Sequence, residues 1–167
     1  ADSGYYVHMT ETKSAIGGVM AQLDKTFPTN DCSMCVISPK LVECGRHLNI
    51  DLMTLTEIES VTGEMGNFTV KLRQNARYID MDKCTACGEC AKACPIDTPN
   101  MFDEGLRDRK AAFKLYPQGM PSAYAIEKRG TAPCKATCPA HVSIQGYIAL
   151  INDGRYKEAL KLFKQDH

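Results

Sequence analysis

Four cysteines in one short stretch constrain this chain more than any other feature of its sequence. Residues 84–95 read CTACGECAKACP. The spacing Cys-x2-Cys-x2-Cys-x3-Cys-Pro is the one that bacterial proteins use to bind [4Fe–4S] clusters, and the fourth cysteine of such a run usually ligates a second cluster. The spacing therefore predicts Cys84, Cys87 and Cys90 as ligands of one cluster and Cys94 as a ligand of another.

Two other uses of cysteine fit this spacing poorly. A structural zinc site pairs two Cys-x-x-Cys units that are separated by a dozen or more residues. Disulfides are disfavoured because the cysteine count of nine is odd, the thiols are crowded, and no secretory leader is present. We therefore expect a cytoplasmic protein, in a reducing compartment where thiolates remain available for metal.

Charge and hydropathy exclude several classes of partner. The 20 basic and 20 acidic residues cancel, which argues against affinity for nucleic acid or a membrane surface through bulk positive charge. No apolar run approaches the length of a membrane span. The sequence begins inside a patterned stretch and stops directly after a helix-like run, so we expect it to be part of a longer protein.

The N-terminal stretch has the pattern of a nucleotide-binding strand. Residues 5–10 (YYVHMT) are rich in β-branched and aromatic side chains, and Glu11 closes them. In a Rossmann unit, an acidic residue at the end of the second strand binds the ribose of a dinucleotide. The glycine fingerprint expected about 20 residues upstream would precede Ala1. Glu11 is therefore either a ribose ligand or a solvated carboxylate.

A second group of cysteines follows at positions 32, 35 and 44. Cys32 and Cys35 could form a redox dithiol, part of a metal site, or a pair of buried small side chains. Ser38 and Pro39 suit the cap and first turn of a helix that would bring Cys44 back toward the loop. We expect the three thiols to ligate a cluster, with a core-facing helix position as the alternative for Cys44.

The remainder of the chain alternates between predicted strands and helices. Residues 50–55 predict a strand, and the alternating pattern on both sides of residues 63–67 predicts a hairpin with its turn there. Residues 105–115 predict a polar helix with a solvated basic face. Two amphipathic helices separated by Gly154 are predicted at the C-terminus. Before them, Cys134 and Cys138 could join Cys94 in a second cluster that needs one more thiolate, expected beyond His167. Alternatively, one of them could join the first cluster and leave Cys94 with ligands from outside this chain.

Residues 12–50 also carry a specific family pattern. The pattern consists of an acidic residue, a short gap, I-G-G-x-M-x-Q-L-x-x-x-F-P-T and a Cys-x-x-Cys. It closely resembles the flavin domain of the heterodisulfide reductase HdrA family, which has a thioredoxin-reductase-like fold. The later order F-D-x-G-L-x-x-R-K-A and Y-P-Q-x-x-P resembles the ferredoxin segment inserted in that family. Residues 134–167 are also similar to the start of the two-cluster domain of the glutamate synthase small subunit.

The resemblance implies FAD in addition to [4Fe–4S] clusters, and an iron–sulfur centre at Cys32 and Cys35 that is completed by ligands from other parts of the full-length protein. It implies as partners the other subunits of a heterodisulfide reductase-like complex, with ferredoxin or a hydrogenase- or formate dehydrogenase-type protein as electron donor. The residues that the resemblance places at the flavin are Glu11, Gly17, Gly18, Met20, Leu23, Thr29 and Ile58.

Together these features predict an α/β chain in three parts. Residues 1–80 are expected to form part of a Rossmann-type FAD domain, residues 81–133 an inserted ferredoxin-like module, and residues 134–167 the start of a helical cysteine-containing segment. The predicted function is electron transfer between FAD and clusters in an iron–sulfur flavoprotein oxidoreductase, with electron bifurcation as an option. The alternatives are a ferredoxin-type carrier without flavin and a glutamate synthase-like reductase subunit. No catalytic acid, base or nucleophile stands out.

Overall fold

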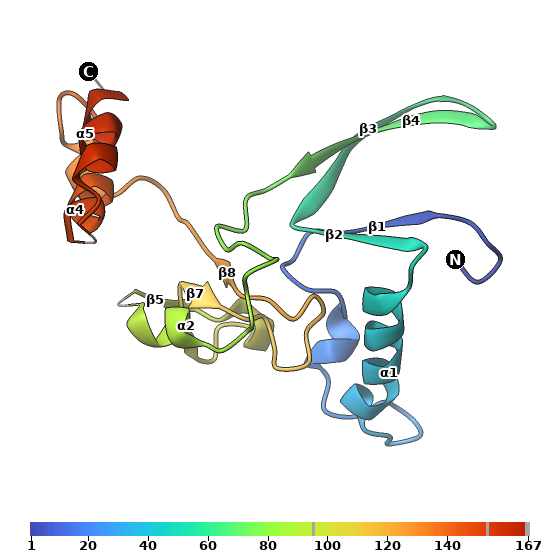
Figure 1. Ribbon diagram of the computed structural model, residues 1–167. Helices are drawn as coiled ribbons and strands as arrows, with labels where there is room; N and C mark the ends of the chain where they lie inside the picture. Colours follow the sequence, from blue (N-terminus) through green and yellow to red (C-terminus); the bar gives the residue numbers. More distant parts are fainter. Residues whose placement is uncertain (95, 153, 166–167) are drawn as a thin grey trace. The chain divides into compact units, whose positions relative to one another are not determined.

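The computed structural model of the chain describes residues 1–94, 96–152 and 154–165. It divides into two compact units, Ala1–Glu127 and Lys128–His167 (Figure 1). The mixture of helices and strands agrees with the predicted α/β class. Within the described residues, no helix combines the length and the apolar character needed to cross a membrane.

The first unit begins with a β-α-β arrangement. Strands β1 (Val7–Glu11) and β2 (Ile50–Thr54) pair in parallel, with Glu11 opposite Thr54 at their carboxyl ends. Parallel neighbours need a long crossover connection, which is supplied here by the 3-10 turn η1 (Val19–Gln22) and helix α1 (Ser33–Arg46) (Figure 1). The strand predicted at residues 5–10 therefore forms, with Glu11 as its last residue.

Helix α1 begins earlier than the sequence predicted. The expected start at Ser38 and Pro39 is wrong, because Cys32 caps the helix and Pro39 lies inside it. The Cys32 sulfur accepts a hydrogen bond from the Cys35 N–H at 3.2 Å. Ser33 is fully buried and its hydroxyl donates to the Met20 carbonyl at 2.5 Å. These contacts fix the start of the helix, while Pro39 removes only one helical hydrogen bond.

The predicted hairpin is confirmed, but its turn is tighter than expected. Strands β3 (Thr56–Glu64) and β4 (Asn67–Gln74) pair in antiparallel fashion, so Gly63 still lies in the ladder, opposite Phe68. A Cβ atom on Gly63 would overlap the Asn67 carbonyl oxygen, so only glycine fits this close pairing.

The cysteine run leads into a small module of paired strands. Helix α2 (Glu89–Ala93) is followed by two antiparallel pairs, and the helix predicted at residues 105–115 is wrong because strands occupy that stretch. Pairing with segments distant in sequence overrides the local helical pattern there. The elements are β5 (Asp97–Pro99), η2 (Met101–Asp103), β6 (Asp108–Lys110), β7 (Ala112–Phe113) and β8 (Ala125–Ile126).

The basic run in this module forms no helix face, and only part of it is solvated, since Arg107 is exposed but Arg109 is not. Arg109 lies over the Phe113 ring, 3.4 Å from its centroid, and donates to Glu127 at 2.5 Å. Its side chain is largely buried, at 17% exposure. A cation held between a ring and a carboxylate belongs to the packing of the module, not to its solvated surface.

The core of the first unit joins the module to the β-α-β segment. Tyr116 is 5% exposed, donates its hydroxyl to the Ile16 carbonyl, and stacks on Phe102 with ring centroids 5.2 Å apart. The Ile16 N–H in turn donates to the Met120 carbonyl at 2.9 Å. The buried members of this cluster are Ala15, Ile16, Ala21, Leu41 and Tyr116.

The second unit contains α3 (Pro133–Ala136), α4 (Ile144–Asn152) and α5 (Tyr156–Gln165). The two predicted amphipathic helices are therefore confirmed, with Gly154 between them at φ +74°. The rings of Tyr147 and Phe163 meet edge to face at 6.0 Å, so the apolar faces of α4 and α5 contact each other.

Candidate metal centre and nucleotide edge

Three of the predicted cluster ligands share one cavity. Cys84, Cys87 and Cys90 line a space of about 310 Å³, together with Tyr78 and Tyr124. Cys84 and Cys90 are partly buried and Cys87 is exposed. The loop and the first turn of α2 thus place these three cysteines on the wall of one space.

The loop reaches this conformation through two left-handed residues. Ala86 has φ +58° and Gly88, the residue that precedes α2, has φ +85°. A Cβ atom at Gly88 would lie 3.0 Å from the Tyr124 hydroxyl. Gly88 therefore allows both the turn into α2 and the close approach of Tyr124. The Tyr124 N–H donates to the Cys84 sulfur at 3.5 Å, the kind of hydrogen bond that stabilises a metal-ligating thiolate.

The local electrostatics also favour the thiolate form, which is the form that binds metal. A backbone hydrogen bond at Glu89, followed by the Thr85 side chain, lowers the pKa of the Cys87 thiol. Backbone hydrogen bonds, the largest from Ala112, lower the pKa of Cys94.

These properties predict the order of thiol alkylation in metal-free protein. Cys87 is exposed and its pKa is lowered, so it carries more thiolate near neutral pH than an ordinary thiol. We expect iodoacetamide to modify Cys87 well before the partly buried Cys44, as measured by mass spectrometry of peptides over time. Reconstitution with iron and sulfide should protect Cys87 and leave the modification of Cys44 unchanged. Equal rates for the two thiols in the metal-free protein would contradict this expectation.

The remaining predicted ligands of a second cluster are divided between the two units. Cys94 is the C-terminal cap of α2 in the first unit and, among the described residues, is not part of the lining of the three-cysteine cavity. Cys134 and Cys138 lie in and after α3 in the second unit, where the Cys134 thiol donates to the Gln145 side chain at 3.3 Å.

The three thiols of Cys32, Cys35 and Cys44 do not converge on one site. Cys32 and Cys35 form a disulfide at the start of the helix, with Cα atoms 5.2 Å apart. Cys44 lies in the same helix, roughly 13 Å along its axis from Cys35 at about 1.5 Å per residue. It packs against the core that contains Leu41 and Tyr116. One cubane therefore cannot take both Cys35 and Cys44 from this helix, and the core position weighed for Cys44 is the one observed.

No described group of three or more histidine, cysteine or acidic side chains is arranged to hold a single metal ion. A zinc site would need thiolate sulfurs about 2.3 Å from one central ion. Three cysteines on one cavity supply the donor type that a [4Fe–4S] cluster takes from a Cys-x2-Cys-x2-Cys run.

A second candidate site lies at the carboxyl edge of the parallel strands, where α/β folds bind nucleotides. Glu11 is partly buried there, and its Oε1 accepts hydrogen bonds from the Lys13 N–H at 2.8 Å and the Thr12 hydroxyl at 3.2 Å. Leu55, which follows β2, donates its N–H to the Lys13 carbonyl. These contacts hold the Glu11 carboxylate at the end of its strand.

The two adjacent glycines have different surroundings. Gly17, at φ +136°, faces Tyr116 so closely that a Cβ atom would overlap the ring hydroxyl. Its role in the structure is to admit Tyr116. Gly18, at φ +55° and ψ −151°, has no heavy atom within 4 Å of a Cβ position and needs glycine for its backbone alone. Of the two, Gly18 is the one that leaves room for the approach of a cofactor.

The other predicted flavin residues vary in exposure. Met20 is partly buried, whereas Leu23 and Thr29 are exposed. Ile58 is 57% exposed on β3. The β3–β4 ladder shifts register between Ile58 and Ser60, so the backbone near Ile58 is irregular.

Arg77 is a site residue that the sequence did not reveal. Its guanidinium donates to the Ser14 carbonyl at 2.8 Å and to the Thr54 hydroxyl at 2.5 Å, both at the nucleotide edge, and to the Tyr124 carbonyl at 3.3 Å, beside the cysteine cavity. Burial lowers the pKa of Arg77, and the neighbouring Cys84 acts in the opposite direction. One cation therefore contacts both candidate sites.

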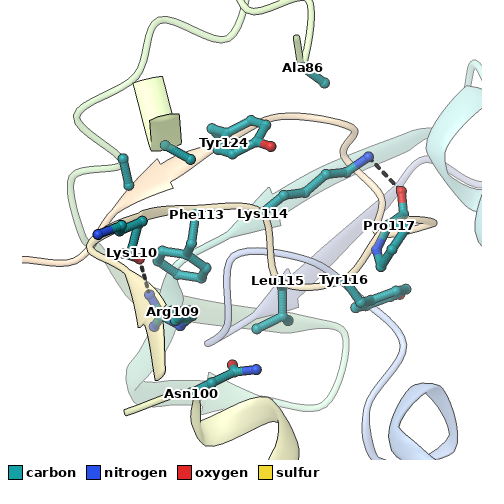
Figure 2. A pocket seen from close by; sticks show the side chains of 12 residues that line it. Ala86, Asn100, Arg109, Lys110, Phe113, Lys114, Leu115, Tyr116, Pro117 and Tyr124 are labelled. Carbon is teal, nitrogen blue, oxygen red and sulfur yellow. Dashed lines mark hydrogen bonds between the residues drawn. The ribbon is translucent and has the colours of Figure 1, made fainter. Parts of the chain in front are cut away.

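A further hollow of about 480 Å³ lies on the module, and Figure 2 shows the rings of Phe113, Tyr116 and Tyr124 around it. Tyr124 also lines the cysteine cavity, so its ring is common to both spaces. Lys114 is held at one side of the hollow by hydrogen bonds to the Pro117 carbonyl and the Ser122 hydroxyl.

Comparison with known proteins agrees with this geometry. Residues 77–99 match the family model described as "4Fe-4S binding domain", and this range contains Cys84, Cys87 and Cys90. The chain is 54% identical over 126 residues to a protein of Methanopyrus kandleri, which is named as the second of its iron-sulfur A subunits of CoB--CoM heterodisulfide reductase. The match covers 75% of this chain and 19% of the relative.

Two further relatives carry similar names. One, from Methanothermobacter thermautotrophicus, is named as the A subunit of H(2):CoB-CoM heterodisulfide,ferredoxin reductase and is 48% identical over 134 residues, covering 80% of this chain and 20% of the relative. Another, from Archaeoglobus profundus, is named as a protein like the A subunit of heterodisulfide reductase and is 42% identical over 163 residues, covering 83% of this chain and 23% of the relative. The chain thus spans about a fifth of the length of these relatives.

Proposed function

Because this chain belongs to the HdrA family of heterodisulfide reductase A subunits and contains a 4Fe–4S binding domain, we propose that it is the electron-transfer segment of an iron–sulfur flavoprotein. The observation that carries the proposal is the convergence of Cys84, Cys87 and Cys90 on one cavity. When bound, [4Fe–4S] clusters exchange single electrons and a flavin exchanges one or two.

Each residue of the cavity has a distinct task in this proposal. The three cysteines supply thiolates, whose negative charge is favoured by nearby hydrogen bonds, such as that from the Tyr124 N–H to Cys84. The left-handed conformations of Ala86 and Gly88 turn the backbone around the cluster. The Tyr124 ring lines the cavity. Such hydrogen bonding and burial set the reduction potential of a cluster.

The nucleotide edge supports an FAD site in the same unit. Glu11 ends β1, and its second carboxylate oxygen could accept a hydrogen bond from a ribose hydroxyl, while Gly18 offers the open approach that Gly17 does not. In this proposal Met20, Leu23, Thr29 and the backbone at Ile58 contact other parts of the flavin. The parallel β1–β2 pair with its α1 crossover is the arrangement that a Rossmann-type site requires.

Further clusters complete the proposal. Cys94, Cys134 and Cys138 would act as further cluster ligands, and Cys32 and Cys35, once reduced to thiolates, would serve a centre with ligands from other parts of the full-length protein. The partners would be the remaining subunits of a heterodisulfide reductase-like complex, with ferredoxin or a hydrogenase- or formate dehydrogenase-type donor. In such a complex the flavin would pass electrons to the clusters and could split electron pairs between two acceptors.

A combined analysis of iron, acid-labile sulfide and flavin in the anaerobically purified full-length protein tests this proposal, together with low-temperature EPR after reduction. We expect two or more [4Fe–4S] clusters and FAD. Clusters without FAD would favour a ferredoxin-type carrier. Zinc, or an absence of iron and sulfide, would exclude the proposed function altogether.

A further inference from the structure

Arg77 connects the two candidate sites through a short series of hydrogen bonds. Its guanidinium binds Ser14 and Thr54 on one side and the Tyr124 carbonyl on the other. The Tyr124 N–H then donates to the Cys84 sulfur at 3.5 Å. The Arg77 backbone takes part as well, because its carbonyl accepts the Ile126 N–H at 3.0 Å. A shift of Arg77 would therefore move the segment that hydrogen-bonds the cluster ligand.

We propose that Arg77 is a positioning residue that raises the reduction potential of the cluster held by Cys84, Cys87 and Cys90 and sets its place relative to the nucleotide edge. This inference rests on the proposed function, since it requires the cluster. It concerns a residue that lies outside the cysteine run and outside the predicted flavin residues.

The physical reason is electrostatic. Each reduction step adds a negative charge to a cluster, and a fixed, partly buried cation nearby stabilises that charge more than water-exposed cations do. An arginine keeps its charge even when it is partly buried, and its planar fork can bind several oxygens at once. Arg77 makes three such contacts, whereas Arg73 on β4 is exposed and pairs with Glu57 and Glu59. Arg73 is therefore a matched control of the same residue type.

The hydrogen bond to Cys84 contributes in the same direction. An N–H donor to a ligating sulfur withdraws charge from it and favours the reduced cluster. Arg77 holds the Tyr124 carbonyl and, through its own carbonyl, Ile126, so it fixes the segment from which that N–H points. Loss of Arg77 would thus remove a positive charge and loosen a hydrogen-bond donor together.

The experiment is an EPR-monitored redox titration of the full-length protein and its variants under anaerobic conditions. The signal of this cluster is identified as the component that disappears in Cys87→Ala. We expect Arg77→Gln to shift the reduction equilibrium of this signal at least about tenfold toward the oxidised form, which is about 59 mV for one electron. Arg77→Lys should recover part of this shift, and Arg73→Gln should leave the potential unchanged.

An unchanged potential in Arg77→Gln, with the cluster present, would overturn the inference. If Arg77→Gln takes up no iron at this site, Thr54→Val decides the matter. It removes one contact of the guanidinium, keeps the charge, and should shift the potential in the same direction by a smaller amount. No shift in Thr54→Val would then overturn the inference as well. Absence of the cluster from the wild-type protein would instead disprove the proposed function, so the two failures are distinguishable.

Discussion

Replacing Cys84 with alanine is expected to remove about four irons and four sulfides per chain, the content of one [4Fe–4S] cluster. Cys84, Cys87 and Cys90 face one cavity, so the loss of one thiolate leaves an iron of the cluster without its protein ligand. Cys84 also accepts the Tyr124 N–H, so the substitution leaves that partly buried donor without an acceptor. Iron and sulfide analysis with EPR of the reduced protein measures the loss.

The matched control for this substitution is Cys44→Ala. Cys44 lies on α1 and packs against the core, so its removal should cost a modest amount of stability, on the order of 1 kcal/mol, and no iron. A normal iron content in Cys84→Ala would contradict the assignment of the cavity. If Cys44→Ala lost iron while its free energy of unfolding stayed unchanged, Cys44 would be a cluster ligand after all.

The second large effect is expected at Gly17. Gly17→Ala should lower the free energy of unfolding by about 3 kcal/mol, because it combines an unfavourable left-handed φ with overpacking. The new Cβ atom would overlap the Tyr116 hydroxyl and lie 2.9 Å from the Ala21 side chain. Tyr116 is in the centre of the core and cannot move aside without breaking its contacts with Phe102 and the Ile16 carbonyl. Urea denaturation measures the change.

Two comparisons separate the causes of this effect. Gly66→Ala introduces an alanine at φ +89° with no heavy atom within 4 Å of its Cβ, so it should cost only the backbone strain, about 1 kcal/mol. In a Tyr116→Phe background the hydroxyl is gone, and Gly17→Ala should cost at least about 1 kcal/mol less than in the wild-type protein. Equal costs in both backgrounds would mean that Tyr116 does not constrain Gly17.

If Gly17 serves the core, the I-G-G pattern has a divided function. The first glycine admits Tyr116 from the cysteine-containing module, and the second is left open beside the nucleotide edge. In this interpretation, the first glycine is needed for packing between the β-α-β segment and the module, and only the second is needed for binding a cofactor. In that case Gly17→Ala should reduce the iron and flavin contents only in proportion to the unfolded fraction, whereas Gly18→Ala, which also strains the backbone, should lower the flavin content by more than its unfolded fraction accounts for.

Local features of the sequence were sufficient for the elements whose interactions are short in range. The Cys-x2-Cys-x2-Cys loop closes within a few residues, so its three cysteines line one cavity. The helices α4 and α5 likewise follow from their apolar periodicity. In each case, the physical information lies inside one window of sequence.

Only the tertiary structure decided the features that depend on distant contacts. Residues 105–115 have a helical pattern but form strands, because β5 and β8 offer them hydrogen-bonding partners. Cys44 belongs to the core because α1 begins at Ser33 and separates it from Cys35 along one rigid axis. Arg77 and Tyr124 meet at the cysteine cavity although 47 positions separate them. No local sequence pattern predicts this contact, because the burial and charge at a site depend on residues that are distant in sequence and meet only in the folded chain.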